Sequence, residues 1–408
     1  MRLKAALLVG CLSFALGVPA HAQGPVLLAA WTQVGPHGTL LARAIARLGC
    51  PSARVDGATL PMTQRAAPDK SFGVWSCELQ LSRGVRTVFV AERRLPLPPS
   101  HLRTVAVLAD SGCRIELIFF QACNDPAKWP FASVARAIAA AHPDLIVHDG
   151  NYYERETACF ARGCAGSPHG DNWPTWQTDF FDPAAPMLAN AALLAVRGNH
   201  EDCARGGAGW DRFLDVFAYG PCTAHEPAYP TTLGGMRFFV LDSSTGVDVQ
   251  PTRTAVPLYA RDFAALRALG PAPTFLLTHR PMWALEGTLT GGTLTINRTL
   301  QAAEGNPRTL DVQLVLSGHV HLFEALTFAD RRPPQIVVGT GGDTLAGVPL
   351  HIDGTSIDGT HVQAGTIHRG FGFAMFHLDE HRLDVYDRSG RKVYACGYAP
   401  GTVSCRPS

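Results

Sequence analysis

Short apolar segments alternate with amphipathic stretches between residues 104 and 317, and this alternation restricts the chain to a layered α/β fold. The apolar segments predict strands at Thr104–Leu108, Leu145–His148, Leu193–Arg197, Arg237–Leu241, Thr274–Thr278 and Val312–Ser317. The amphipathic stretches predict helices at Pro130–Ala141, Trp173–Phe181 and Leu258–Leu269. In a sheet built from such βαβ units, ligands bind at the carboxyl ends of the strands.

The sequence on either side of this alternation is richer in strands. Residues 23–102 contain short apolar runs broken by Pro, Gly and polar turns, which predict a small β-rich N-terminal region. Three prolines between residues 96 and 99 indicate a boundary after this region. Later strands are expected at Leu322–Phe328, Gln335–Val338, Gly372–Leu378 and His381–Tyr386. We therefore expect a main domain over 103–395 and a short C-terminal tail over 396–408.

The first 22 residues predict a secretory signal peptide. A positively charged start precedes an apolar run that ends near Val18, and Ala20-His21-Ala22 fits a small-x-small cleavage site, so we expect cleavage near Ala22. Residues 8–11 resemble a lipoprotein box, but the apolar run continues past them, which favours simple cleavage. No stretch reaches the roughly 18 uninterrupted apolar residues of a membrane span. The mature chain is expected to be secreted or periplasmic.

The amino-acid composition of the chain indicates which classes of binding partner to expect. The chain has 35 Lys and Arg against 34 Asp and Glu, so its near-zero net charge argues against electrostatic capture of nucleic acid or of an anionic membrane. Hydrophobic residues make up 46% of the chain and charged residues 17%, which excludes a disordered protein and indicates a compact globule. A small molecule is the expected partner.

Polar residues of the types that bind metals follow five of the predicted strands. They are Asp110, Asn151 after Gly150, Asn199-His200-Glu201 after Gly198, His279, and His319 with His321 after Gly318. A lone Asp at a strand end is usually a turn or helix cap, and a lone buried His is usually structural. Jointly, however, these residues would meet at one edge of a sheet, and two imidazoles two positions apart lie on one side of an extended chain. The series therefore predicts a functional site.

This series of motifs resembles the calcineurin-like metallophosphoesterases, and among them the secreted purple-acid-phosphatase-like group. The resemblance spans about residues 104–395. It implies an αββα sandwich of mixed β-sheets flanked by helices, which binds two divalent or trivalent metal ions and hydrolyses phosphate esters. Carried over motif by motif, it assigns Asp110 and His321 to the first metal, Asn199, His279 and His319 to the second, and His200 to the scissile phosphate. Ligands of these types suit iron, zinc or manganese without choosing among them.

The second motif departs from the family pattern. The family has an Asp that bridges both metals after the glycine, and this chain has the neutral Asn151. Three positions later, where purple phosphatases carry a metal-binding Tyr, stands Glu154. Three interpretations stay open: a rewired site in which Glu154 or Asp149 restores the anionic charge, a natural degenerate site that binds one metal or none, and an engineered substitution. We list Asn151 and Glu154 with the candidate metal ligands.

Other residues near these motifs are candidates to position the substrate. Arg114 and Arg155 are candidates to bind phosphate, because a planar guanidinium matches its oxygens, although a surface salt bridge is the more usual role of either residue. Glu201 is expected to fix the orientation of the His200 imidazole.

The leading hypothesis is a secreted metal-dependent phosphoesterase that cleaves phosphomonoesters or small nucleotides by means of a metal-bound water. The alternatives are a metal- or phosphate-binding protein that has little turnover because of Asn151, and a phosphodiesterase or pyrophosphatase. The motifs do not fix the leaving group.

Cysteine content fits the same compartment. The chain has 11 cysteines, and cleavage of the leader removes one of them, Cys11, which leaves an even number. The remaining ten are Cys50, Cys77, Cys113, Cys123, Cys159, Cys164, Cys203, Cys222, Cys396 and Cys405. We expect five disulfides between sequential neighbours, although sequence alone leaves the connectivity open.

Overall fold

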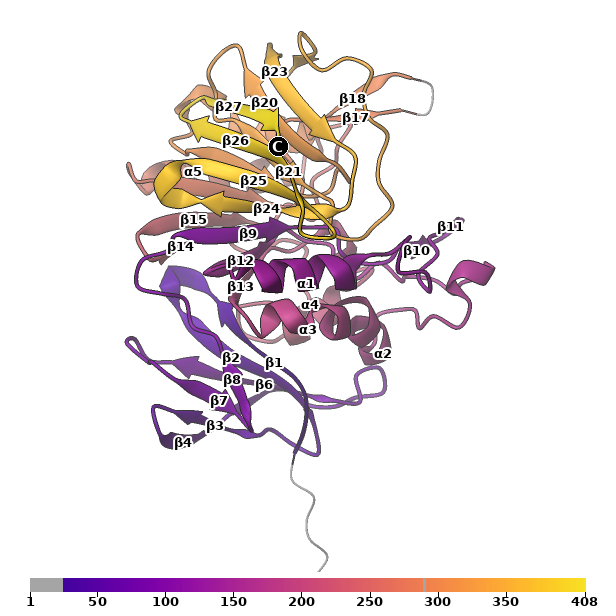
Figure 1. The fold of residues 1–408 in the computed structure, drawn as a ribbon, viewed down its shortest axis with the longest axis vertical. Coiled ribbons are helices and arrows are strands. Elements are labelled where there is room, and N and C mark those ends of the chain that lie inside the picture. The colour runs from indigo at the N-terminus through magenta and orange to yellow at the C-terminus, as the bar shows by residue number, and fades with distance from the viewer. Residues whose placement is uncertain (1–24, 289–290) are drawn as a thin grey trace, which may run out of the picture.

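Two β-sheets packed face to face form the centre of the molecule (Figure 1). The computed structural model describes residues 25–288 and 291–408, so the predicted signal peptide lies outside the described residues. Within these ranges the first sheet has eleven strands and the second has eight. None of the helices in the described ranges is long and apolar enough to cross a membrane.

The first sheet runs through the whole length of the molecule. Its strands, in spatial order, are β27 (Thr402–Pro407), β26 (Lys392–Ala399), β25 (Arg382–Asp387), β24 (Gly372–His377), β9 (Thr104–Leu108), β12 (Leu145–His148), β13 (Ala192–Ala195), β1 (Val26–Val34), β2 (Leu40–Arg47), β6 (Trp75–Leu81) and β5 (Thr63–Ala66). The central strands β9, β12 and β13 are parallel, as the predicted βαβ alternation requires.

The second sheet mixes parallel and antiparallel pairs. Its order is β14 (Tyr229–Leu233), β15 (Met236–Leu241), β16 (Thr274–Thr278), β19 (Leu314–Ser317), β21 (Gln335–Val338), β20 (Phe323–Phe328), β23 (Thr360–His368) and β22 (Ser356–Ile357). Strands β15, β16, β19 and β21 are parallel neighbours. Their carboxyl ends therefore meet at one edge of this sheet.

Alternation along each strand divides its side chains between two layers. On β9, Val105 and Val107 belong to the core between the sheets, and Ala106 and Leu108 face the helices. One helical layer contains α1 (Phe131–Ala141), α2 (Trp173–Trp176), a π-helical turn at Gln177–Phe181, α3 (Asp182–Leu188) and α4 (Gly207–Phe213). The other contains α5 (Ala255–Ala268) and α6 (Arg298–Glu304). The order helix, sheet, sheet, helix is the αββα sandwich that the resemblance implied.

The N-terminal region is β-rich, as the sequence predicted. A four-stranded sheet has the order β4 (Ala58–Pro61), β3 (Ser52–Val55), β7 (Val88–Val90) and β8 (Arg93–Leu95). The other strands of this region, however, continue the first large sheet, because β1 pairs in parallel with β13. A boundary at residue 102 stays a prediction, and the segment 396–408 completes the opposite edge of the same sheet as part of the β26–β27 hairpin.

Two small hairpins project from the sandwich on the right-hand side of Figure 1. One joins β10 (Ile115–Glu116) to β11 (Phe119–Phe120), and the other joins β17 (Ala284–Gly287) to β18 (Thr293–Ile296). The ten described cysteines form disulfides between the expected sequential neighbours: Cys50–Cys77, Cys113–Cys123, Cys159–Cys164, Cys203–Cys222 and Cys396–Cys405.

Candidate metal centre

The loops that follow the strands place their polar residues in uncommon backbone conformations. Asp110 follows β9, Asn151 follows β12 and His319 follows β19, and their φ angles are 55°, 60° and 69°. An L-residue in this left-handed region costs roughly 1–2 kcal/mol. Such strained residues cluster at functional sites, where the surrounding structure holds them.

Glycines allow these loops to approach one another. A Cβ atom on Gly198 would lie 2.2 Å from the Asn151 nitrogen, and one on Gly318 would lie 2.3 Å from the Ala109 Cβ. Neither distance is sterically possible. The loop after β13 can therefore approach the loop after β12, and the loop after β19 can approach the loop after β9, because these two positions lack a side chain.

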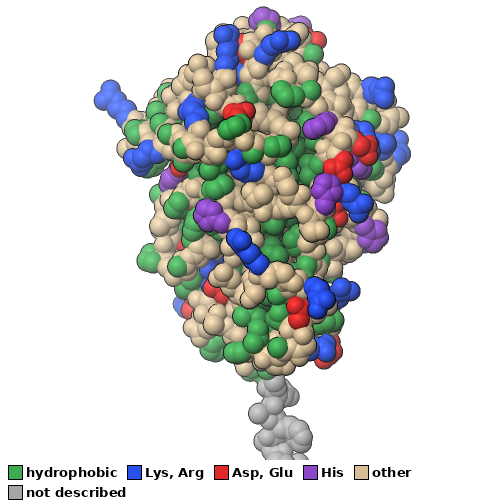
Figure 2. Space-filling model, turned by 90° about the vertical axis from the view of Figure 1, so that its left-hand side faces the viewer, with side chains coloured by type: hydrophobic (Ala, Val, Ile, Leu, Met, Phe, Trp, Pro, Cys, Tyr) green, Lys and Arg blue, Asp and Glu red, His purple; other side chains and the backbone are tan. Residues whose placement is uncertain are grey.

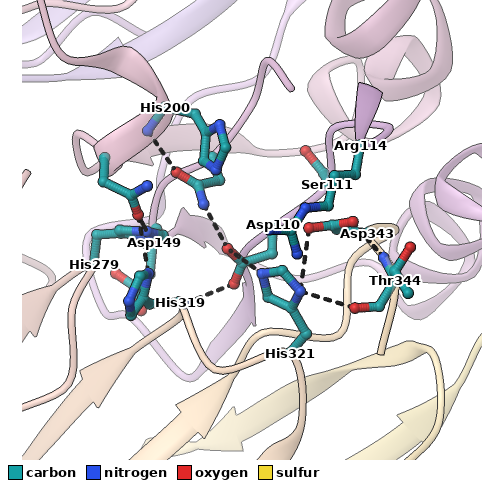
Figure 3. Close-up of polar contacts among 12 residues, drawn as sticks. Asp110, Ser111, Arg114, Asp149, His200, His279, His319, His321, Asp343 and Thr344 are labelled. Atoms are coloured by element: carbon teal, nitrogen blue, oxygen red, sulfur yellow. Dashed lines mark hydrogen bonds and ion pairs between the residues drawn. The ribbon is translucent and has the colours of Figure 1, made fainter. Parts of the chain in front are cut away.

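Asp110 is the hub of the site (Figure 3). Its Oδ1 accepts a hydrogen bond of 2.9 Å from the Asn151 Nδ2, and its Oδ2 accepts one of 2.7 Å from the His319 backbone N–H. The Nε2 of His321 lies 3.5 Å from Oδ1, and the Nδ1 of His321 lies 3.1 Å from the Asp343 Oδ2. Burial lowers the pKa of His321, but Asp343 and Asp110 raise it by more, to about 10.

Further carboxylates lie buried beside this hub. The carboxyl group of Glu154 faces that of Asp343, and neither Glu154 oxygen has a hydrogen-bond donor. Both oxygens of Asp149 are also buried without a donor. Burial first, and then the neighbouring carboxylates, raise the pKa of Glu154 and of Asp149 well above the ordinary range. A buried carboxylate without a donor is costly, so each of these groups is stabilised either by a proton or by a cation bound beside it.

On the other side of Asp110, three ligand-type atoms converge. The Asn199 Oδ1 lies 2.8 Å from the His279 Nε2 and 2.9 Å from the His319 Nδ1. The His279 Nδ1 donates to the Asp149 carbonyl at 2.6 Å, so the neutral ring directs the lone pair of Nε2 at Asn199. The His319 Nε2 contacts Asp248 at 2.9 Å, which leaves its Nδ1 to face Asn199. A cation is the natural partner for acceptor atoms that converge in this way.

We call Asp110, His321, Glu154 and Asp343 the acidic half of the site. Asn199, His279 and His319 are called the imidazole half. Figure 3 shows His279 and His319 on one side of Asp110, and His321 and Asp343 on the other. Carboxylate, imidazole and amide oxygen suit iron, zinc and manganese, so the residues present fit the metals that the sequence implied.

His200 stands above Asp110 in Figure 3, in a 3₁₀ turn formed by Asn199–Glu201. Its backbone N–H donates to the Asn151 Oδ1 at 3.1 Å, and its Nδ1 lies 2.7 Å from the Glu156 Oε1. Atoms of Glu116, Glu156 and His200 lie within 4.8 Å of one another, a spacing that could also hold a cation. Burial lowers the pKa of His200 to about 3, so the imidazole is neutral.

The predicted role of Glu201 is wrong. Its carboxylate accepts hydrogen bonds from four backbone N–H groups, those of Asn151, Tyr152, Tyr153 and Gly198. It therefore ties the loop after β12 to the loop after β13 and does not orient the imidazole of His200. Glu156 does so instead. The Tyr153 ring stacks on Trp176 with centroids 5.8 Å apart, away from the metal-type ligands.

A cavity of about 760 Å³ opens above these residues. Its floor is formed by Asn151, Asn199, His200, His319 and His321. One wall contains Arg114, Glu116, Phe119, Phe120 and Gln121, and the other contains Glu286, Gly287, Leu294 and residues 344–347. The two projecting hairpins thus form opposite walls around the site.

The structure separates the two candidate phosphate-binding arginines. Arg114 lines the cavity, where its Nη2 donates to Glu116 at 2.9 Å and its guanidinium lies over the Phe119 ring. Arg155 does not reach the cavity: it is buried, donates to the Asp179 carboxylate at 2.6 Å, and lies over the Trp129 ring. The expectation that Arg155 binds phosphate is therefore wrong, because a buried carboxylate already occupies its guanidinium.

Sequence reasoning missed three acidic residues of the site. Asp343 directly follows a glycine-rich turn at residues 339–342, after β21, and such a turn behind a strand is the local signal that could have identified it. Asp248 lies in the irregular segment after β15, and Glu156 lies two positions after Glu154. Neither position continues a strand or a motif, so the sequence offered no period or spacing to identify it.

Comparisons with known proteins show the family and the fold of the chain. The family model for calcineurin-like phosphoesterases matches residues 103–323, which is more than half of the chain. No curated protein sequence matches.

Two solved structures share the fold at low identity. A purple acid phosphatase, PPD1, from seeds of yellow lupin (Lupinus luteus) superposes with a TM-score of 0.60 at 15% identity, covering 90% of this chain and 73% of that one. The structure of PhoD superposes with a TM-score of 0.55 at 10% identity, covering 96% of this chain and 94% of that one.

Proposed function

Because the chain belongs to the calcineurin-like phosphoesterase family, we propose that it is a metal-dependent hydrolase of small phosphate esters that acts outside the cytoplasm. One observation above all supports this proposal: two sets of ligand atoms converge on either side of Asp110, at the floor of a cavity large enough for a small ester. The five disulfides, together with the predicted signal peptide, support secretion or a periplasmic location.

The proposal assigns one metal ion to each half of the site. Asp110 and His321, with Glu154 and Asp343 beside them, would hold the first, and Asn199, His279 and His319 would hold the second. When bound, such ions supply a water that is nucleophilic at neutral pH and neutralise charge on the phosphoryl oxygens. The metals themselves stay unidentified, because the ligand set accepts iron, zinc or manganese.

The chain's own side chains would then orient the ester. Arg114 offers a positive charge to a phosphoryl oxygen from the cavity wall. Glu156 holds the Nδ1 of His200, which leaves Nε2 as the ring nitrogen that can exchange a proton or a hydrogen bond with an ester oxygen. Phosphoryl transfer depends mainly on such positioning and on charge neutralisation, and no protein nucleophile is required.

A second candidate function follows from Asn151. Its amide donates to Asp110 and accepts from the His200 N–H, so both of its polar atoms are satisfied without a cation between the halves. A carboxylate at this position would face Asp110 across about the same distance and would need a cation to offset the repulsion. A metal- or phosphate-binding protein with little turnover is therefore the alternative to the enzyme.

Metal content and turnover of p-nitrophenyl phosphate, measured on the metal-loaded protein and on Asn151→Asp, separate these functions. We expect both proteins to be active, with Asn151→Asp faster by roughly 10- to 100-fold because a carboxylate restores the bridge. Asn190→Asp makes the same exchange at an exposed helix end and should change nothing.

The other possible results of this assay also distinguish the enzyme from the binding protein. If both proteins are inert although metals are bound, the enzyme hypothesis fails. If only Asn151→Asp turns over, the natural chain is the binding protein. The same assay on phosphodiesters and pyrophosphate tells which leaving group the site accepts.

A further inference from the structure

Large apolar side chains are exposed on both sides of the cavity mouth. At the tip of the β10–β11 hairpin, Leu117 is 77% exposed and Ile118 is 81% exposed. On the opposite side, Leu294 of β18 is 39% exposed, and Leu350, which approaches Gly291 of the β17–β18 hairpin, is 72% exposed. Apolar side chains gathered around a cavity usually mark a binding surface.

The first of these two rims is held in place covalently. The Cys113–Cys123 disulfide closes the segment that contains the β10–β11 hairpin, and Cys159–Cys164 closes the neighbouring loop. The exposed Phe160 of that loop contacts Phe120 edge to face, with ring centroids 6.1 Å apart. These apolar side chains therefore stay at the surface because the scaffold fixes them there.

The apolar surface continues from the rims into the cavity. Phe119 and Phe120 line one wall, and Leu294 and Leu345 line the other, above the polar floor. The walls contain two positively charged residues, Arg114 and Arg205, and two negatively charged residues, Glu116 and Glu286. The side chains of the walls therefore add no excess of positive charge to that of the metal ions proposed at the floor, and so do not favour a polyphosphate or a nucleic acid. On the face turned away from the hairpins, apolar and charged side chains are interspersed (Figure 2).

We propose that the cavity binds phosphate esters whose alcohol portion is apolar. The phosphate lies over the floor near Asp110 and His200, and the apolar portion lies between Phe119 and Leu294. A volume of about 760 Å³ leaves room for such a group beyond the phosphate. The inference rests on the proposed function for turnover, but it specifies a ligand class that binding alone can test.

Chain-length series test this assignment with two readouts. We expect kcat/KM for n-alkyl phosphates, followed by phosphate release below their aggregation concentration, to rise by roughly two- to fourfold for each added methylene. We expect the Kd of n-alkylphosphonates, which are not cleaved, to fall with the same slope in calorimetric titrations of the metal-loaded protein. The second readout is independent of turnover.

Leu294→Ser and Phe119→Ser should each flatten both slopes. Leu60→Ser is the matched control, because Leu60 is also a strand leucine that is 39% exposed, in β4 at the opposite end of the molecule (Figure 1). Its slopes should equal those of the natural chain. Thermal unfolding of each variant checks that the fold is kept.

Flat slopes in the natural chain, or slopes that Leu294→Ser and Phe119→Ser leave unchanged, overturn the inference. If light scattering shows a dimer that Leu117→Ser disrupts, and the slopes are flat, the rims bind a second copy of the chain instead. If no ester is cleaved but phosphonate affinity rises with chain length, the proposed function fails and the ligand class stands.

Discussion

The two halves of the site differ in charge more than in geometry. The acidic half brings two carboxylates, Asp110 and Asp343, to the His321 imidazole, and a third, Glu154, faces Asp343 with both of its oxygens lacking a donor. The imidazole half offers two imidazole rings and one amide, and its nearest carboxylate, Asp248, contacts the His319 Nε2 on the side of the ring away from Asn199. The acidic half thus has more carboxyl groups than its hydrogen bonds satisfy, and the imidazole half has no carboxylate on the side of the rings that faces Asn199.

This difference in charge shows how Asn151 affects the distribution of negative charge in the site. In the family pattern, a bridging carboxylate at this position would share negative charge between both halves. Here the amide leaves the charge of the acidic half undivided and adds none to the imidazole half. We therefore expect a cation to bind the acidic half more tightly than the imidazole half, because a cation offsets the repulsion between carboxylates that lie close together in a buried site.

Glu154→Gln gives the largest expected effect. It removes a buried carboxylate that faces Asp343, so the affinity of the acidic half for a divalent cation should fall by roughly 10- to 100-fold. The metal-free protein should become more stable by on the order of 1 kcal/mol, because folding no longer has to bury or protonate this carboxyl group. Metal titration and thermal unfolding measure the two changes, and an unchanged affinity would remove Glu154 from the site.

Stepwise metal removal tests the same asymmetry in the natural chain. A chelator titration should empty the imidazole half first, and the two dissociation constants should differ by about tenfold or more. Metal analysis at each step counts the ions that remain bound, and the histidine resonances in NMR spectra show which half has lost its ion. Simultaneous loss of both ions would contradict the comparison between the halves. In Asn151→Asp the two constants should move closer together.

Asp248→Asn should weaken the imidazole half alone. Asp248 holds the His319 Nε2 and is itself held by Arg280 and by the Asn297 amide at 2.8 Å. Loss of the charge behind a ligating imidazole lowers metal affinity, here by about fivefold to tenfold. The acidic half should keep its affinity. A change in both halves would mean that the variant disturbs the whole edge of the sheet.

Glu156→Gln should leave both metal affinities unchanged and lower kcat by roughly threefold to tenfold. Its carboxylate holds the His200 Nδ1, and an amide holds that nitrogen less firmly. A shifted pH profile of kcat with an unchanged metal content identifies a positioning role. If kcat and its pH profile both stay as in the natural chain, Glu156 has no part in catalysis.

Glu324→Gln is the control for Glu154→Gln and has the smallest expected effect on the metal site. Glu324 is also buried with an oxygen that lacks a donor, but it lies on β20, apart from the ligands. Burial raises its pKa to about 8. Its contribution to stability is complete below pH 4.5 and disappears as the pH rises through 8, so Glu324→Gln should match the natural chain at pH 5 and exceed it at pH 9, by roughly 1–3 kcal/mol. Metal affinity should not change.

Strand positions were predictable because buried strands are apolar runs of the right length. The bounds of β9, β12 and β16 are those that the sequence predicted, and the residues directly after them carry the site. The roles of Glu201 and Arg155 were wrong because a sequence does not reveal which backbone groups or carboxylates a buried charge will meet. Asp248, Asp343 and Glu156 come from irregular segments, whose course depends on tertiary packing.

β1 lies far from the candidate site in the sequence, but its pairing with β13 protects the strand that leads into the site. β13 leads directly into the loop that carries Asn199 and His200, and β1 is its outer neighbour. Without β1, the backbone N–H and C=O groups of β13 would form an open edge, which other chains could extend by strand addition. The N-terminal region thus closes the sheet next to the reactive loops, and a chain lacking residues 26–34 would be exposed to aggregation at the strand that carries its chemistry.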